Sequence, residues 1–80
     1  MAVAVLVYFR KVSEDAERVT YAFGGDPDAF TRRLAMAVAG SRTAVPDDGR
    51  VDHLFLKASR KINAMREESG RWPERGMSAS

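Results

Sequence analysis

Residues 51–69 read VDHLFLKASRKINAMREES, and this stretch carries the clearest secondary-structure signal in the chain. At about 100° per residue its apolar side chains fall on one stripe, formed by Val51, Leu54, Phe55, Ala58, Ile62 and Met65. The side chains that face away from the stripe are polar or charged: His53, Lys57, Arg60, Lys61 and Glu68. Gly70 suits the position after a helix, and Pro73 prevents its continuation. The stretch predicts one long amphipathic helix that covers a hydrophobic layer.

The layer under this helix is predicted from the N-terminal part of the chain. Residues 2–10, AVAVLVYFR, alternate strand-forming side chains between two faces, and both faces are apolar. Such a strand lies either inside its sheet or against a second chain. Residues 12–17 are mostly polar and turn the chain, and residues 18–23 alternate again. The two segments predict a β-hairpin.

The segment after this hairpin fits two templates. A proline at the first helical position and a terminating glycine favour a helix over 27–39. Against it, apolar side chains alternate with alanines over 33–38, and Gly40-Ser41 is a two-residue turn that leads into a strand at 42–45. Because two strands alone are marginally stable in water, the sheet needs the second template. We therefore expect a short helical turn at 27–31 and then a second hairpin.

The expected fold class is α+β, with an antiparallel β-sheet of three to four strands packed by one long C-terminal helix. Residues 47–49 form a turn that offers a capping carboxylate to this helix. We assign residues 1–73 to a single α+β domain and residues 74–80 to a flexible C-terminal tail. Trp72 is expected to fold back over the edge of the sheet.

Composition narrows the class of protein. The chain has 80 residues and no cysteine, so neither disulfide bonds nor zinc thiolates supplement a small core. It shows no signal-peptide pattern and no apolar run of membrane-spanning length, which predicts a soluble, cytoplasmic protein that does not bind membranes. The net charge of +2 is spread over interleaved arginines and acidic residues, so the average field is expected to be weak.

The order of several landmarks along the chain carries a family resemblance. These landmarks are Tyr8-Phe9-Arg10, Phe23-Gly24, Pro46-Asp47-Asp48-Gly49 and Trp72-Pro73-Glu74-Arg75-Gly76. In this order the chain resembles a group of short uncharacterised bacterial proteins of high-GC genomes that end in a WPERG-type tail. The resemblance covers most of the chain, and it implies no particular chemistry.

The sequence shows no catalytic or metal-binding motif. His53 is the only histidine, and the nearby Asp48 and Asp52 are typical helix-cap and dipole partners. Asp47 joins them in a carboxylate cluster, but the spacing of a calcium-binding loop is missing. Gly24-Gly25 follows a strand without the rest of a phosphate-binding motif. We therefore expect no catalytic residue, no metal ligand and no cofactor, and a protein that is not an enzyme.

Three apolar side chains outside the expected core are candidate partner-binding residues. Leu6 and Tyr8 lie on the second face of the first strand, and Leu56 lies on the polar side of the helix. If these side chains cluster, the patch marks a partner surface, because a thin domain rarely exposes one without a use. The leading hypothesis is a small non-enzymatic accessory module for protein–protein interaction, which we expect to be a homodimer.

The alternative is a nucleic-acid-binding module that uses the basic face of the helix. Its contact residues are Arg50, Lys57, Arg60 and Lys61, which together neutralise a few phosphates. Every soluble helix needs a charged face, however, and Glu68 shares this one. The sequence therefore ranks nucleic acid below a protein partner.

Overall fold

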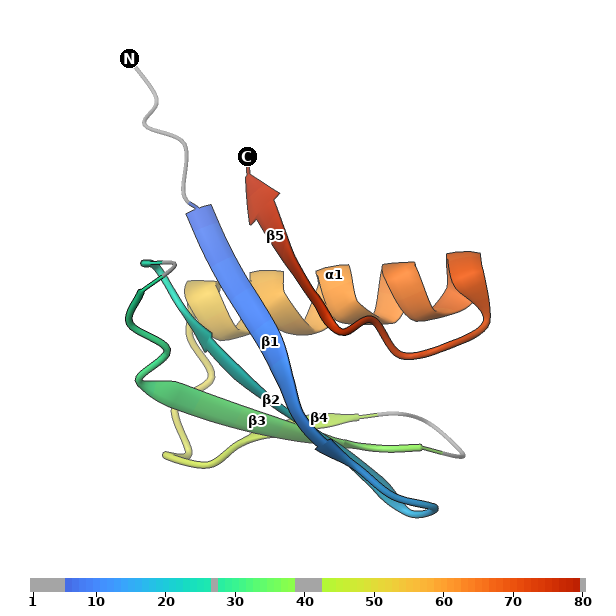
Figure 1. The fold of residues 1–80 in the computed structure, drawn as a ribbon. Coiled ribbons are helices and arrows are strands. Elements are labelled where there is room, and N and C mark those ends of the chain that lie inside the picture. Colours follow the sequence, from blue (N-terminus) through green and yellow to red (C-terminus); the bar gives the residue numbers. More distant parts are fainter. Residues whose placement is uncertain (1–5, 27, 39–42, 80) are drawn as a thin grey trace.

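The computed structural model describes residues 6–26, 28–38 and 43–79. Within these ranges five strands form one antiparallel sheet in the order β4-β3-β2-β1-β5, and one helix packs against it (Figure 1). The elements along the chain are β1 Leu6–Glu14, β2 Arg18–Gly24, β3 Arg32–Ala37, β4 Ala44–Pro46, α1 His53–Ser69 and β5 Arg75–Ala79. The α+β class is confirmed, with one strand more than expected.

Alternate residues of three neighbouring strands form the buried face of the sheet. They are Val7, Phe9, Val19, Tyr21, Phe23, Leu34 and Met36. Phe55, Ala58 and Ile62 of α1 pack against them and complete the core. The alternation predicted for these strands and most of the predicted helical stripe are therefore confirmed. The residues between the buried strand positions lie on the opposite face, because strand side chains alternate.

β1 lies inside the sheet, between β2 and β5. The helix side of β1 is buried, whereas Leu6 on its other apolar face is 37% exposed. The predicted strand is seen from Leu6 to Glu14, while residues 2–5 lie outside the described ranges. Asp15 closes the turn to β2, since its carboxylate accepts hydrogen bonds from the backbone N–H groups of Glu17 and Arg18, both at 2.8 Å. β3 and β4 confirm the second hairpin, and its Gly40-Ser41 turn also lies outside the described ranges.

The two ends of α1 show how the chain enters and leaves the helix. Asp52 is the N-cap, and its carboxylate accepts a hydrogen bond from the Phe55 N–H at 3.0 Å. Asp52 is thus confirmed as a capping carboxylate, whereas the expectation that the turn at 47–49 supplies the cap is wrong. Val51 lies before the helix and is 65% exposed, so its place in the core stripe is also wrong. Gly70 ends the helix in the left-handed conformation at φ 79°, as predicted. None of the described segments forms a helix with the length and apolarity of a membrane span.

The C-terminal segment is a strand in the structure, and the expectation of a loose tail at 74–80 is wrong for residues 75–79. These residues form β5, which pairs with β1 so that Tyr8 stands opposite Met77. Trp72 is buried in the core at 5% exposure, and the Tyr21 hydroxyl donates a hydrogen bond to the Pro73 carbonyl at 2.5 Å. Burial raises the pKa of Tyr21, so its hydroxyl keeps the proton that it donates. These contacts direct the chain along the edge of the sheet.

The connection between β2 and β3 contains no helix in its described residues, so the helical turn expected at 27–31 is not formed there. Ala29 N–H donates to the Asp26 carbonyl at 3.1 Å, and Asp28 N–H donates to the Asp26 carboxylate at 2.8 Å. These two bonds make a tight turn that uses the aspartate side chain in place of a helical partner.

Gly76 sets how closely β5 approaches the core. A Cβ atom at this position lies 2.7 Å from the Phe9 ring and 3.3 Å from the Met65 sulfur. Because Phe9 is buried, its ring has little room to move, and we expect Gly76→Ala to lower the free energy of unfolding by about 1–2 kcal/mol. Urea denaturation followed by far-UV circular dichroism measures this loss. Gly25→Ala is the control, because its Cβ meets only a carbonyl oxygen at 3.8 Å; equal losses in both variants contradict the assignment.

Candidate binding face

The helix covers one face of the sheet, and the opposite face carries the candidate site. We call this opposite side the open face. Its cations are Arg10 on β1, Arg18 on β2, Arg33 on β3 and Arg75 on β5. The strand register sets Arg10 directly opposite Arg75, and Arg18 two positions from Thr20 on the same face. One arginine from each of four strands is thus presented on a single surface.

The open-face arginines are not paired with carboxylates. Within residues 6–26, 28–38 and 43–79, none of these four guanidinium groups forms an ion pair. Some cations elsewhere are neutralised, as in the contacts of Lys11 with Glu14 at 2.7 Å and with Glu74 at 3.1 Å. Arg60, Lys61 and Arg71 are exposed and form none of the described ion pairs. The open face therefore brings together four arginines, one from each of four neighbouring strands, that form none of the described ion pairs.

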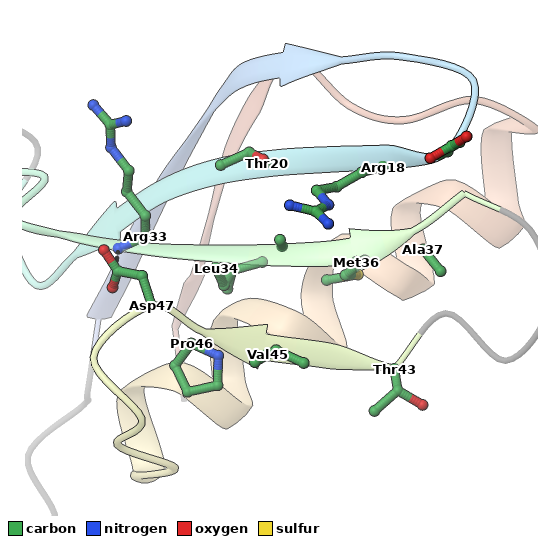
Figure 2. Close-up of a pocket in the computed structure, with 12 residues that line it drawn as sticks. Arg18, Thr20, Arg33, Leu34, Met36, Ala37, Thr43, Val45, Pro46 and Asp47 are labelled. Atoms are coloured by element: carbon green, nitrogen blue, oxygen red, sulfur yellow. Dashed lines mark hydrogen bonds between the residues drawn. The ribbon is translucent and has the colours of Figure 1, made fainter.

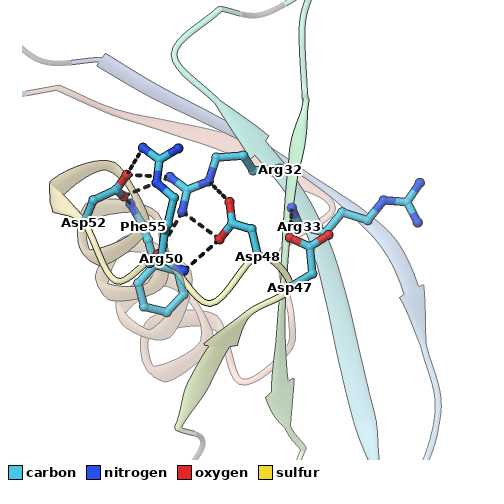
Figure 3. Close-up of polar contacts among 7 residues, drawn as sticks. All are labelled: Arg32, Arg33, Asp47, Asp48, Arg50, Asp52 and Phe55. Atoms are coloured by element: carbon cyan, nitrogen blue, oxygen red, sulfur yellow. Dashed lines mark hydrogen bonds and ion pairs between the residues drawn. The ribbon is translucent and has the colours of Figure 1, made fainter.

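Arg32 is the clearest neutralised cation, and its neighbours include two of the three carboxylates singled out in the sequence (Figure 3). Its Nε lies 2.8 Å from Asp48, and its Nη1 lies 2.9 Å from both carboxylate oxygens of Asp52. The guanidinium also stacks over the Phe23 ring at 4.8 Å from the centroid, and only 12% of the side chain is exposed.

The contacts with Arg32 give the carboxylates of Asp48 and Asp52 a structural role. Hydrogen bonds from the Arg32 side chain and from the Phe55 N–H lower the pKa of Asp52 to about 2. Asp48 accepts a further bond from the Arg50 N–H at 2.9 Å. Asp47 lies apart from these contacts, and its carboxylate accepts a hydrogen bond from the Arg33 backbone N–H at 3.3 Å. The carboxylates of Asp48 and Asp52 thus join β3 to the start of α1, and among the described residues no group of three or more potential ligands is placed to hold a metal ion.

Two hollows mark the open face. The larger, about 660 Å³, lies over β2, β3 and β4. Figure 2 shows Arg18 and Thr20 along one side of it and Val45 on the other, with Arg33 and Asp47 at one end. The smaller, about 360 Å³, lies over β1 and β5. Its lining side chains are Tyr8, Arg10, Phe30, Arg75 and Met77.

Phe30 reaches the smaller hollow because the chain folds back after β2. Gly24 lies opposite Tyr8 in the register, so a Cβ at this position points to the open face. That Cβ lies 2.5 Å from the Ala29 carbonyl oxygen, so only glycine lets the connection lie this close to the strand. Phe30 then sits with the Arg10 guanidinium 5.3 Å from the centre of its ring.

The candidate partner-binding residues are divided by the fold. Leu6, which is 37% exposed, and the half-buried Tyr8 lie together on the open face, as predicted. Leu56 lies apart from them, half-buried and packed against the core, so its assignment to the same patch is wrong. The buried face of α1 extends further round the helix than the predicted stripe, because Ser59, one turn after Leu56, is buried as well.

The basic residues of the helix do not form a uniform surface. Arg60 and Lys61 are exposed, whereas Lys57 is half-buried and has a polar partner. Arg50 lies before the helix, and its guanidinium is 3.1 Å from Asp52, which Arg32 also contacts. The four cations therefore present less free charge than their number indicates.

Phe30 and the open-face arginines were not predicted from the sequence as site residues. Phe30 is a single aromatic residue in a polar connection, and its only signal was the Gly24-Gly25 pair that precedes it. The arginines are scattered in the sequence and come together only through strand register.

The site belongs to a small α+β domain with an arginine-bearing sheet face that no described helix covers. No protein-family model, no curated protein and no solved structure matches the chain. The resemblance to short bacterial proteins with a WPERG-type tail thus stays a prediction.

Proposed function

We propose that this protein is a non-enzymatic binding module that holds a polyanionic partner on the open face of its sheet. The observation that carries the proposal is that the strand register gathers four arginines on one face of the sheet, and none of them forms an ion pair among the described residues. Lys11 and Arg32 are held by carboxylates, whereas the arginines of the open face are not. Cations gathered on one surface attract and hold a partner of the opposite sign. The four arginines outnumber the two carboxylates, of Glu17 and Asp47, that line the larger hollow. The cysteine-free sequence supports a cytoplasmic place of action.

The homodimer expected from the sequence stays a prediction, and the charge of the open face weighs against one arrangement of it. Two copies joined face to face would set the same arginines of each copy against one another, and like charges across an interface are unfavourable. The β4 edge offers little for strand pairing between copies, because it has three residues and ends in Pro46. A polyanion satisfies the open face better than a second copy does.

The proposal is tested by the salt dependence of binding to fluorescently labelled inorganic polyphosphate. We expect binding at about 50 mM salt, where phosphate contacts are strong. Contacts from four arginines predict a slope near −3 in a plot of log affinity against log salt, and roughly a 50-fold loss between about 50 and 200 mM. A variant with Arg10, Arg18, Arg33 and Arg75 all replaced by glutamine is expected to lose at least about tenfold in affinity and most of the salt slope.

The matched control removes the same formal charge from the helix side. It replaces Arg50, Lys57, Arg60 and Lys61 with glutamine, and these are the residues of the sequence-based nucleic-acid alternative. We expect this variant to bind polyphosphate nearly as well as the unmodified protein. If the control variant loses binding and the open-face variant keeps it, the binding site lies on the helix and the proposal is contradicted. Absence of binding by the unmodified protein contradicts it as well.

A further inference from the structure

We propose that the polyanion is a single-stranded nucleic acid, and that one of its bases stacks on Phe30 in the smaller hollow of the open face. This inference rests on the proposed function, because it names the chemistry of the partner that the arginines hold. The hollow measures about 360 Å³, within the range of roughly 300–1,000 Å³ that small-molecule sites occupy. The open face as a whole thus offers a charged surface and, at one place, a recess with an aromatic wall.

The walls of the hollow are suited to a flat, aromatic group. Phe30 and Tyr8 are both half-buried, so each keeps part of its ring accessible. The Arg10 guanidinium already lies against the Phe30 ring, with 5.3 Å between the guanidinium carbon and the ring centre. Unpaired bases stack on aromatic side chains and on arginine planes, and antiparallel sheets with exposed aromatic residues use this contact to bind single-stranded RNA.

The register of β1 and β5 supplies a second, independent observation. Arg10 and Arg75 stand directly opposite each other across the two strands, on the same face. Like charges in this position destabilise a sheet, and no ion pair with either guanidinium is found among the described residues. A phosphate group between the two arginines removes this repulsion, and it lies at the rim of the hollow that takes the base.

The other arginines extend the contact across the sheet. Neighbouring strands lie about 4.8 Å apart, so the distance from β5 to β3 is roughly 14 Å. Arg33 on β3 lies at that distance from Arg75, in the same row across the sheet. Arg18 lies on β2, one strand nearer to Arg75 and four residues along that strand from this row, and both arginines line the larger hollow. A flexible single strand of several nucleotides can therefore place its phosphates on all four arginines while one base occupies the smaller hollow. A duplex cannot do so, because its bases stay stacked inside the helix.

The choice between nucleic acid and an acidic peptide depends on Phe30. Carboxylates of a peptide satisfy the arginines equally well, but they make no use of an aromatic recess beside the charges. A nucleotide combines a phosphate with a flat ring a short distance away, which is the combination that Arg75, Arg10 and Phe30 present. We therefore favour the nucleic acid, and polyglutamate becomes an arm of the test.

The experiment measures fluorescence anisotropy of labelled probes with the full chain. The probes are a single-stranded RNA of about ten nucleotides, the DNA of the same sequence, the same backbone with abasic positions, a duplex, polyphosphate and polyglutamate; ten lies inside the range of about 4–16 nucleotides of known single-strand sites. We expect the RNA or DNA strand to bind more tightly than every other probe. The RNA and DNA arms tell which of the two the site prefers.

Phe30→Leu separates stacking from charge. It keeps an apolar side chain and removes the ring, so binding of the single strand is expected to fall between roughly five- and 150-fold, the range for loss of one stacked base. Binding of polyphosphate is expected to stay unchanged. Val51→Ala is the control, because Val51 is exposed and lies outside the open face.

Phe30→Trp provides a second test of base stacking for the case in which Phe30→Leu does not fold. The indole retains the stacking surface, so affinity is expected to be kept, and its fluorescence is expected to be quenched when a base stacks on it. The native Trp72 is buried and contributes a constant signal. Quenching by the single strand, and not by polyphosphate, supports the inference.

Two kinds of result overturn the inference, and they are distinguishable. If polyphosphate, polyglutamate, the duplex or the abasic strand binds as tightly as the single strand, or if Phe30→Leu weakens all probes equally, charge alone holds the partner; the inference fails and the proposed function stands. If no probe binds at about 50 mM salt, both fail.

Discussion

Trp72→Ala is expected to lower the free energy of unfolding by about 3–5 kcal/mol, which is the cost of truncating a large aromatic residue in a core. Trp72 is 5% exposed and belongs to the same buried cluster as Phe9 and Ile62. It precedes Pro73, whose carbonyl accepts a hydrogen bond from the Tyr21 hydroxyl at 2.5 Å. A domain of this length has a total stability of only about 4–12 kcal/mol, so the variant is expected to be partly or wholly unfolded. Urea denaturation followed by far-UV circular dichroism measures the loss.

Trp72→Phe is the matched control for this loss. Among the described residues, the Trp72 indole nitrogen is buried without a hydrogen-bond partner, so a phenyl ring removes no bond and keeps most of the apolar surface. We expect a loss below about 1.5 kcal/mol. If Trp72→Ala is no less stable than Val51→Ala, the C-terminal segment does not fold cooperatively with the sheet.

Trp72 also marks the limit of what local patterns predict in this fold. The helix α1 and the strands β1 to β3 were predicted because their apolar side chains repeat at the helical or strand period within one segment. β5 reads RGMSA, which is short and poor in strand-forming residues. It is a strand because of contacts with residues distant in sequence. Gly76 has no side chain and lets β5 lie against the Phe9 ring, and the Tyr21 hydroxyl donates a hydrogen bond to the Pro73 carbonyl.

The candidate site, too, was predicted only in the part that a local sequence pattern defines. Leu6 and Tyr8 were placed on one face correctly, because residues two apart in a strand share a face. Because cations and acids alternate along the chain, the sequence predicts a weak electrostatic field. The fold separates them: Asp48 and Asp52 bind Arg32 beside α1, whereas Arg18 and Arg75 face the other way. Averaging charge over the sequence therefore hides the feature that defines the open face.

Arg32→Met is expected to lower the free energy of unfolding by about 2 kcal/mol. The reason is that Arg32 is the centre of the joint between β3, the β4–α1 connection and the N-terminus of α1 (Figure 3). Hydrogen bonds to charged groups contribute roughly 1.5–3 kcal/mol. The expected loss stays within this range because the carboxylates of Asp48 and Asp52 are one-third exposed, so water hydrates them in the variant. Methionine keeps the apolar contact with the Phe23 ring, so the loss reports the polar contacts.

The pH dependence of stability identifies Arg32 as the cause of this loss. Asp52 has a pKa of about 2 in the folded protein, below its ordinary value of 3.8, so its contribution is complete above pH 4 and is lost as the pH falls toward 2. The pKa of Asp48 is lowered as well, first by its hydrogen bond from Arg32. Urea denaturation at a series of pH values from about 2 to 7 is therefore expected to show the curves of the two proteins converging toward low pH.

The control for both measurements is Lys11→Met, which removes a cation paired with the exposed Glu14 and Glu74. Surface ion pairs contribute about 0–1 kcal/mol, so a small loss of stability is expected. If Lys11→Met costs as much as Arg32→Met, or if the stability of Arg32→Met falls as steeply below pH 4 as that of the unmodified protein, the Asp48 and Asp52 carboxylates are not held by Arg32. The joint between β3 and α1 then depends on apolar packing alone.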